Sequence, residues 1–110
     1  NRLAGAIPVW PFDPIRATGP VLVEIYTTVA ARAAGVTGGS KVRHGLALDQ
    51  ALGRLETRPH RLLARYDDHS TDAILTAAWL RAVAATSALW SPPELDSHLA
   101  STEGWTFGIL

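Results

Sequence analysis

The stretch Val21-Leu22-Val23-Glu24-Ile25-Tyr26 decides the fold that the sequence predicts. It is short, rich in β-branched residues and preceded by a turn, and its length is typical of a buried strand. A single strand cannot satisfy its backbone donors and acceptors without neighbouring strands. Residues 103 to 107 alternate like a small strand and can offer one partner. We expect the remaining sheet to come from upstream sequence or from another copy of the chain.

Helices are predicted over much of the chain that follows this strand. Residues 27 to 34 are expected to form a short Ala-rich helix, and Gly38-Gly39-Ser40 a flexible loop. Leucines at helical spacing predict an amphipathic helix at residues 44 to 56. A capping box with proline at the first helical position predicts another helix at residues 91 to 99. The predicted class is therefore a helix-rich α/β fold with one main strand and a short terminal strand.

The longest predicted helix covers residues 71 to 89, with Ser70 or Thr71 as its cap. Apolar side chains surround most of its circumference, so we expect it to be buried on more than one face. Arg81 lies near the centre of this apolar run, where a charge is costly in lipid. The sequence therefore favours a buried helix over a membrane span.

Length and composition indicate one domain without disulfides. The chain has 110 residues, of which 47% are hydrophobic, and it contains no cysteine, so a cytoplasmic location is the expectation. It begins Asn1-Arg2-Leu3 without an initiator methionine, which suits a fragment. We expect residues 1 to 110 to form a single C-terminal segment of one domain that is inactive alone.

Charges cancel over the whole chain, ten basic against ten acidic, but they are segregated along it. Residues 41 to 65 carry six basic and two acidic side chains, whereas residues 66 to 110 carry one basic and six acidic. This pattern fits either a phosphate-facing patch beside an acidic site or ordinary solvated helix faces. Overall charge does not draw the chain to nucleic acid or membranes.

Several motifs resemble those of a known family. Val-Leu-Val-Glu-Ile-Tyr at residues 21 to 26, Asp72-Ala73-Ile74 at the start of an Ala-rich helix, and the terminal Thr-Glu-Gly-Trp at residues 102 to 105 occur in this order. With Trp-Pro-Phe-Asp at residues 10 to 13, they resemble the C-terminal half of the DUF429 family of predicted nucleases in the ribonuclease H-like superfamily. Thr27 stands where that family usually has proline, and one Asp stands where it often has two.

The resemblance implies the C-terminal part of a ribonuclease H-like fold, in which acidic residues meet to hold Mg²⁺ or Mn²⁺. Carried over residue by residue, Glu24 and Asp72 are the two acids, as catalytic residues and metal ligands. Hard divalent cations prefer carboxylate oxygens, and such ions can support phosphodiester cleavage. The alternatives remain open: Glu24 can be ion-paired or exposed at a sheet edge, and Asp72 can simply compensate a helix dipole.

Other polar residues are weaker candidates. Asp68 lies four residues before Asp72 and can share an ion if the helix extends backward, although a capping or solvated loop role is the simpler interpretation. Four arginines can contact phosphate oxygens of a nucleic acid or form an ordinary amphipathic face: Arg54, Arg58, Arg61 and Arg65. The four histidines show no paired spacing typical of a zinc site.

Two functional hypotheses follow. The first is a fragment of a metal-dependent nuclease or an inactive relative, whose partner is the upstream half of the same protein or another copy, with nucleic acid as a possible substrate. The alternative is a non-enzymatic α/β interaction or oligomerisation module. A small-molecule enzyme on the same fold is a third possibility, because a fold does not fix its chemistry.

Overall fold

The computed structural model describes residues 6 to 36 and 42 to 110, and it is helix-rich, with 43% of residues in helices. No regular strand or sheet occurs in these two ranges, so the predicted α/β fold with a main strand at residues 21 to 26 and a terminal strand is wrong. The predicted loop at Gly38 to Ser40 lies outside the described residues. The chain forms two compact units: unit 1 comprises Asn1–Tyr26 and Thr86–Leu110, and unit 2 comprises Thr27–Ala85.

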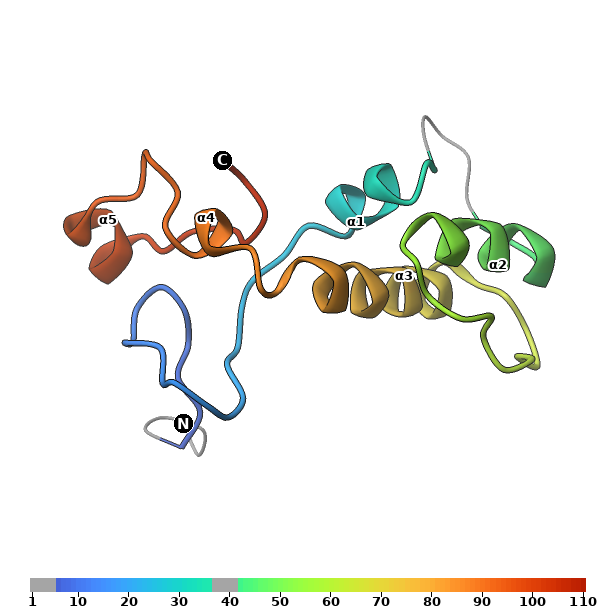
Figure 1. Cartoon of the computed structure of the whole chain (residues 1–110), viewed down its shortest axis with the longest axis horizontal. Coiled ribbons are helices and arrows are strands. Elements are labelled where there is room, and N and C mark those ends of the chain that lie inside the picture. The colour runs from blue at the N-terminus through green and yellow to red at the C-terminus, as the bar shows by residue number, and fades with distance from the viewer. Residues whose placement is uncertain (1–5, 37–41) are drawn as a thin grey trace. The chain divides into compact units, whose positions relative to one another are not determined.

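Unit 2 is built from three helices: α1 (Thr27–Ala33), α2 (Gly45–Arg54) and α3 (Asp68–Val83). Both α1 and α2 contact α3, which runs alongside them in Figure 1. The core of this unit consists of small and apolar side chains that are almost fully buried, namely Ala30, Leu48, Ala51, Leu52, Leu75 and Trp79. Burial of these side chains supplies the main favourable contribution to the stability of the unit.

Helix α2 confirms the prediction made from its leucine spacing. Leu48 and Leu52 are one turn apart and both are buried, as an amphipathic helix requires. His44 is the N-cap, and its Nδ1 accepts a hydrogen bond of 3.3 Å from the backbone N–H of Ala47. The helix ends at Arg54, where the following residues turn away.

Helix α3 differs from its prediction at both ends. The side chain of Asp67 accepts a hydrogen bond of 2.8 Å from the N–H of Ser70, so Asp67, not Ser70 or Thr71, caps the helix. The helix ends at Val83, and α4 (Ser87–Trp90) follows as a separate short helix in unit 1. The predicted continuous helix at residues 71 to 89 is therefore wrong in its extent.

Unit 1 contains α4, α5 (Ser97–Thr102) and extended segments. The side chain of Asp96 accepts a hydrogen bond of 2.8 Å from the N–H of Leu99 and caps α5. Residues 92 to 95 form a turn, in which the N–H of Leu95 donates to the carbonyl of Pro92, so the predicted helix at residues 91 to 99 is wrong.

An aromatic cluster forms the centre of unit 1. Trp10 meets Trp90 edge-on, with ring centroids 5.8 Å apart, and meets Phe107 edge-on at 5.6 Å. Phe107 is completely buried and Trp10 is 4% exposed. Edge-to-face contacts of this kind are favourable beyond the burial of their area. These three rings bring together both chain segments of the unit.

The segment at residues 21 to 26 is extended but makes only two isolated parallel bridges, Val9 with Leu22 and Glu24 with Thr106. The two bridging partners come from different segments, and each meets the extended segment at a single residue. A regular strand needs a ladder of consecutive hydrogen bonds to one neighbour. The predicted strand at residues 21 to 26 is therefore wrong, because the ladder that would make this segment a strand is missing from the described residues.

None of the helices in the described ranges is both long and apolar enough to cross a bilayer.

Candidate functional site

Two carboxylates line the same hollow in unit 1. Glu24 lies on the extended segment, and Glu103 is the C-cap residue of α5. Both residues are exposed, and they border a hollow of about 430 Å³ whose lining residues are Glu24, Tyr26, Glu103, Gly104, Trp105, Thr106 and Ile109. The N–H of Phe107 donates to the carbonyl of Glu24 at 2.8 Å and joins the two walls.

Local backbone geometry fixes the wall that follows α5. The N–H groups of Glu103 and Gly104 both donate to the carbonyl of Leu99, which ends the helix. Gly104 has φ +79°, and a Cβ built there would lie 2.7 Å from Cζ of Phe12. Only glycine adopts this conformation easily and leaves room for the ring. The wall is thus held in place directly beside Glu103.

The indole of Trp105 closes the next part of this wall. Its Nε1–H donates a hydrogen bond of 2.9 Å to the carbonyl of Ile109. Both residues line the hollow, so the bond restrains its rim. Tyr26, on the opposite segment, is 57% exposed and presents its ring to solvent.

The donor set of this hollow suits a hard divalent cation. Mg²⁺ is commonly held by one or two carboxylates, with water molecules and substrate phosphates as its other ligands. Glu24 and Glu103 supply two carboxylates to the lining of this hollow. In the part of the chain that the structure describes, no group of three or more His, Cys, Asp or Glu residues could hold a metal. Within the described residues, an ion in this hollow would therefore have no more than these two carboxylates as acidic ligands.

The other predicted acids lie in unit 2. Asp68 is the first residue of α3, so this helix does extend backward, and Asp72 follows one turn later. A carboxylate oxygen of Asp68 lies 3.5 Å from the Arg43 guanidinium. Because Glu24 belongs to unit 1 and Asp72 to unit 2, the joint site predicted for them is not present within either unit.

Two of the four predicted phosphate-binding arginines make contacts within unit 2. Arg54 donates to the carbonyl of Ala34 at 3.1 Å, and Arg65 lies 3.1 Å from a carboxylate oxygen of Asp67. Arg58 lines a hollow between residues 57 to 60 and α3, and Arg61 is exposed. Contact of these arginines with nucleic acid stays a prediction.

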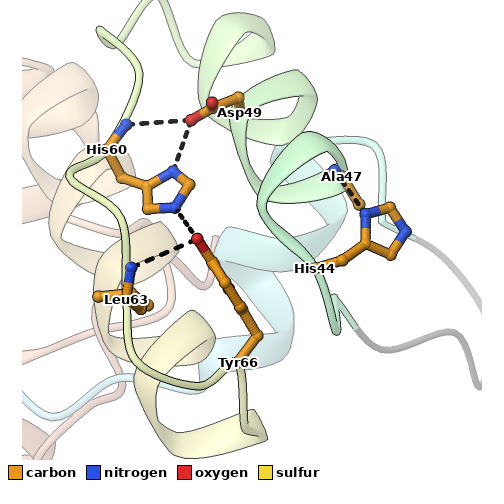
Figure 2. A network of polar contacts seen from close by, with 6 residues as sticks. All are labelled: His44, Ala47, Asp49, His60, Leu63 and Tyr66. Carbon is orange, nitrogen blue, oxygen red and sulfur yellow. Dashed lines mark hydrogen bonds and ion pairs between the residues drawn. The ribbon is translucent and has the colours of Figure 1, made fainter.

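A polar network in unit 2 joins three side chains that the sequence did not link (Figure 2). His60 contacts Oδ1 of Asp49 through Nδ1 at 2.6 Å and the Tyr66 hydroxyl through Nε2 at 2.6 Å. The hydroxyl also accepts from the N–H of Leu63 at 3.4 Å. The carboxylate can only accept, so Nδ1 of His60 carries a proton. Both ring nitrogens are occupied, and the network holds residues 60 to 66, which have no helix or strand.

Two carboxylates of unit 2 have altered acidity. The side-chain hydrogen bond from His60, together with the backbone N–H of the same residue, lowers the pKa of Asp49 below its usual value. The backbone and side chain of Ser70 lower the pKa of Asp67 in the same way, with a smaller contribution from Arg65. Each hydrogen bond favours the charged form of the acid that accepts it. Both acids are therefore acceptors that stabilise local structure.

Glu103 is a candidate site residue that the sequence analysis does not single out. It lies in the Thr-Glu-Gly-Trp motif, but nothing in that motif shows which distant residue lines the same hollow. The adjacent Gly104 was the available signal, because a glycine directly after a helix marks a turn that can aim its neighbours.

Comparison with protein families, with curated proteins and with solved structures finds no match to this chain.

Proposed function

We propose that this chain contributes to a phosphodiester hydrolase that depends on Mg²⁺ or Mn²⁺ and works in the cytoplasm. The observation that carries the proposal is the hollow of unit 1, where Glu24 and Glu103 offer two carboxylates on one surface. The resemblance of residues 21 to 26 and 102 to 105 to a family of predicted nucleases supports the same chemistry. The absence of cysteine supports the location.

The residues of the hollow have separable roles in this proposal. The two carboxylates would hold the cation, which when bound lowers the pKa of a coordinated water and stabilises the departing oxygen. The exposed ring of Tyr26 offers a surface on which a base can stack. The cation would also reduce the repulsion between a phosphate and the two acidic side chains.

The proposed activity requires a partner. Two carboxylates leave most positions around the ion to water and substrate, and further protein ligands would come from the upstream half of the same protein or from another copy. Asp72 and Asp68 stay predicted ligands. We expect the isolated chain to bind the ion weakly and to be inactive.

Metal titration tests the site. Mn²⁺ binding would be measured by electron paramagnetic resonance for the native chain and for Glu24→Gln, Glu103→Gln and Asp72→Asn. We expect each glutamate variant to weaken binding at least about tenfold, because removal of one of two charged ligands leaves a single carboxylate. Unchanged affinity in both glutamate variants rejects the hollow as the site. Weaker binding in Asp72→Asn would include Asp72 among the ligands.

Activity is then tested in the complete protein. Cleavage of single- and double-stranded nucleic acid would be followed with Mg²⁺, with Mn²⁺ and with a chelator. Loss of cleavage in Glu24→Gln, with wild-type thermal stability, agrees with the proposal. Metal-independent cleavage, or full cleavage in that variant, contradicts it.

A second function, a non-enzymatic interaction module, is favoured by a separate observation. Unit 1 exposes large apolar side chains, namely Phe12, Ile15, Leu22, Tyr26, Ile109 and Leu110. Unit 2 also exposes Leu46 and Leu62, so unit 1 carries six of the eight large apolar side chains that are exposed in the described residues. Where such side chains form one contiguous patch, a partner commonly covers it. Association without metal binding by either glutamate would favour this function over hydrolysis.

A further inference from the structure

The extended segment at residues 21 to 26 has two edges, and the chain uses one of them. The N–H of Leu22 donates to the carbonyl of Pro8, and the carbonyl of Leu22 accepts from the N–H of Trp10, both at 2.9 Å. The carbonyl of Glu24 accepts from the N–H of Phe107. In extended backbone, alternate residues direct their hydrogen-bonding groups to the same edge. Both neighbouring segments therefore lie along the edge of the even-numbered residues.

The opposite edge is open. It carries the N–H and C=O groups of Val21, Val23 and Ile25, and none of these groups makes a hydrogen bond within the described part of the chain. Such groups must pair with water or with another extended segment. An edge of this kind is a template for the addition of a strand.

The three residues of the open edge carry little of the usual protection of edges. Proteins guard exposed edges with proline, charged side chains or bulges. Pro20 precedes the segment and Glu24 is its one charged residue, but Val21, Val23 and Ile25, which form the open edge, are all β-branched and apolar. Their side chains are half-buried, and Leu22, between them, is 41% exposed. Both the side chains and the backbone groups of this segment therefore favour the addition of another extended strand at the open edge.

We propose that a second copy of this chain pairs with this edge in the antiparallel sense, about a two-fold axis at Val23. Two-fold contacts bring the same surface of each copy together, and an open strand edge is complementary to itself in this arrangement. Val23 then faces its own equivalent, and Val21 faces Ile25 of the second copy. Each of these pairs exchanges both backbone hydrogen bonds.

Charge supports this register. Residues 22 and 24 of opposite copies face each other, so each Glu24 lies opposite Leu22 of the other copy. The two glutamates are not directly opposed, and like charges directly opposite one another would destabilise the pair. The apolar contacts at Val21, Val23 and Ile25 carry no charge. The register that satisfies the backbone therefore also separates the acidic side chains.

Disulfide mapping tests the register directly, because the chain has no native cysteine. The variants Leu22→Cys and Glu24→Cys would be oxidised alone and as an equimolar mixture, with a chelator present so that metal binding plays no part. Residues 22 and 24 form a non-hydrogen-bonded pair with Cα atoms about 4.5 Å apart, within the range of a disulfide. We expect at least about tenfold more cross-linked dimer in the mixture than in either variant alone.

Val23→Pro in both cysteine backgrounds is the matched control, and Val23→Ala is its comparison. Proline removes the N–H at the centre of the edge, whereas alanine keeps it. We expect proline to abolish the cross-link and alanine to retain it, with near-ultraviolet circular dichroism confirming that the aromatic cluster persists in both. Equal cross-linking of all combinations would overturn the proposal. A native chain that stays monomeric in sedimentation from micromolar to millimolar concentration would also overturn it.

Discussion

Unit 2 and unit 1 differ in how they satisfy their backbone hydrogen-bonding groups and how they form their cores. In unit 2, helices α1, α2 and α3 satisfy their own backbone groups, and a core of leucines and Trp79 is buried between them. In unit 1, two short helices and two isolated bridges leave much of the backbone outside regular structure. Three aromatic rings supply the contacts that the backbone does not.

This difference explains why the structure of unit 2 depends mainly on residues close together in the sequence, whereas that of unit 1 does not. A helix pairs each residue with one four positions away, whereas an extended segment depends on residues far along the chain. Unit 2 is continuous in sequence, but unit 1 joins Asn1–Tyr26 to Thr86–Leu110. Unit 1 therefore depends on distant contacts, and it also carries the open edge and the carboxylate hollow.

Removal of Phe107 should have the largest effect. Phe107→Ala deletes a fully buried ring and is expected to cost about 3–5 kcal/mol of the free energy of unfolding. Leu48→Ala is the counterpart in unit 2, with an expected cost of about 2–5 kcal/mol. Urea unfolding measures both, and amide hydrogen exchange locates the change. Faster exchange should concentrate in unit 1 for the first variant and in unit 2 for the second; uniform acceleration in both would show that the units do not differ in this way.

Gly104→Ala should have an intermediate effect within unit 1. Its positive φ costs about 1–2 kcal/mol for any residue with a Cβ, and the new methyl group would also press on Phe12. Gly19→Ala is the matched control, since Gly19 also has positive φ but has no atom within 4 Å of a Cβ. Thermal unfolding of the two variants isolates the contribution of the Phe12 contact. If Gly104→Ala and Gly19→Ala lower the unfolding temperature equally, the contact with Phe12 does not contribute to the cost.

The smallest effect is expected for Asp49 of unit 2, as a change in how the stability of the unit depends on pH in acid. Hydrogen bonds from His60 lower the pKa of Asp49 below 3.8, so the folded state holds the charged acid more tightly than the unfolded state does. This contribution to stability is present above pH 3.8 and is lost as the pH falls through the lower folded pKa. Asp49→Asn should therefore reduce the pH dependence of the unfolding midpoint in this window. If the unfolding midpoint of Asp49→Asn depends on pH below 4 as steeply as that of the native chain, Asp49 does not contribute to the acid sensitivity of unit 2.

The helices show how far sequence could predict the fold. Leu48 and Leu52 predicted α2 to within two residues at each end, because the spacing of buried side chains is a local property. The start of α3 was misplaced because Ser70, Thr71 and Asp67 are all competent caps, and only the structure shows which side chain accepts the bond. The strand predicted at residues 21 to 26 is wrong, because strand pairing depends on distant segments, and these meet the segment at single residues only.

The candidate site was less predictable than the fold. The resemblance selects Glu24, whereas Glu103 lines the same hollow from a position far along the chain, and no local pattern links the two residues. Asp72 was chosen through resemblance, and it lies in the other unit. The His60 network combines three residues from α2 and an irregular segment, and no periodic pattern marks such a combination.

The contacts of His60 and Tyr66 also limit how this region can change in length. Tyr66 OH lies 2.9 Å from the position that a Cβ of Gly45 would occupy, so both ends of the segment are fixed against α2. Leu62, between them, is 92% exposed. Insertions that accumulate during evolution would therefore be accepted beside Leu62 and removed by selection next to His60 or Tyr66, where one added residue would pull the rings apart.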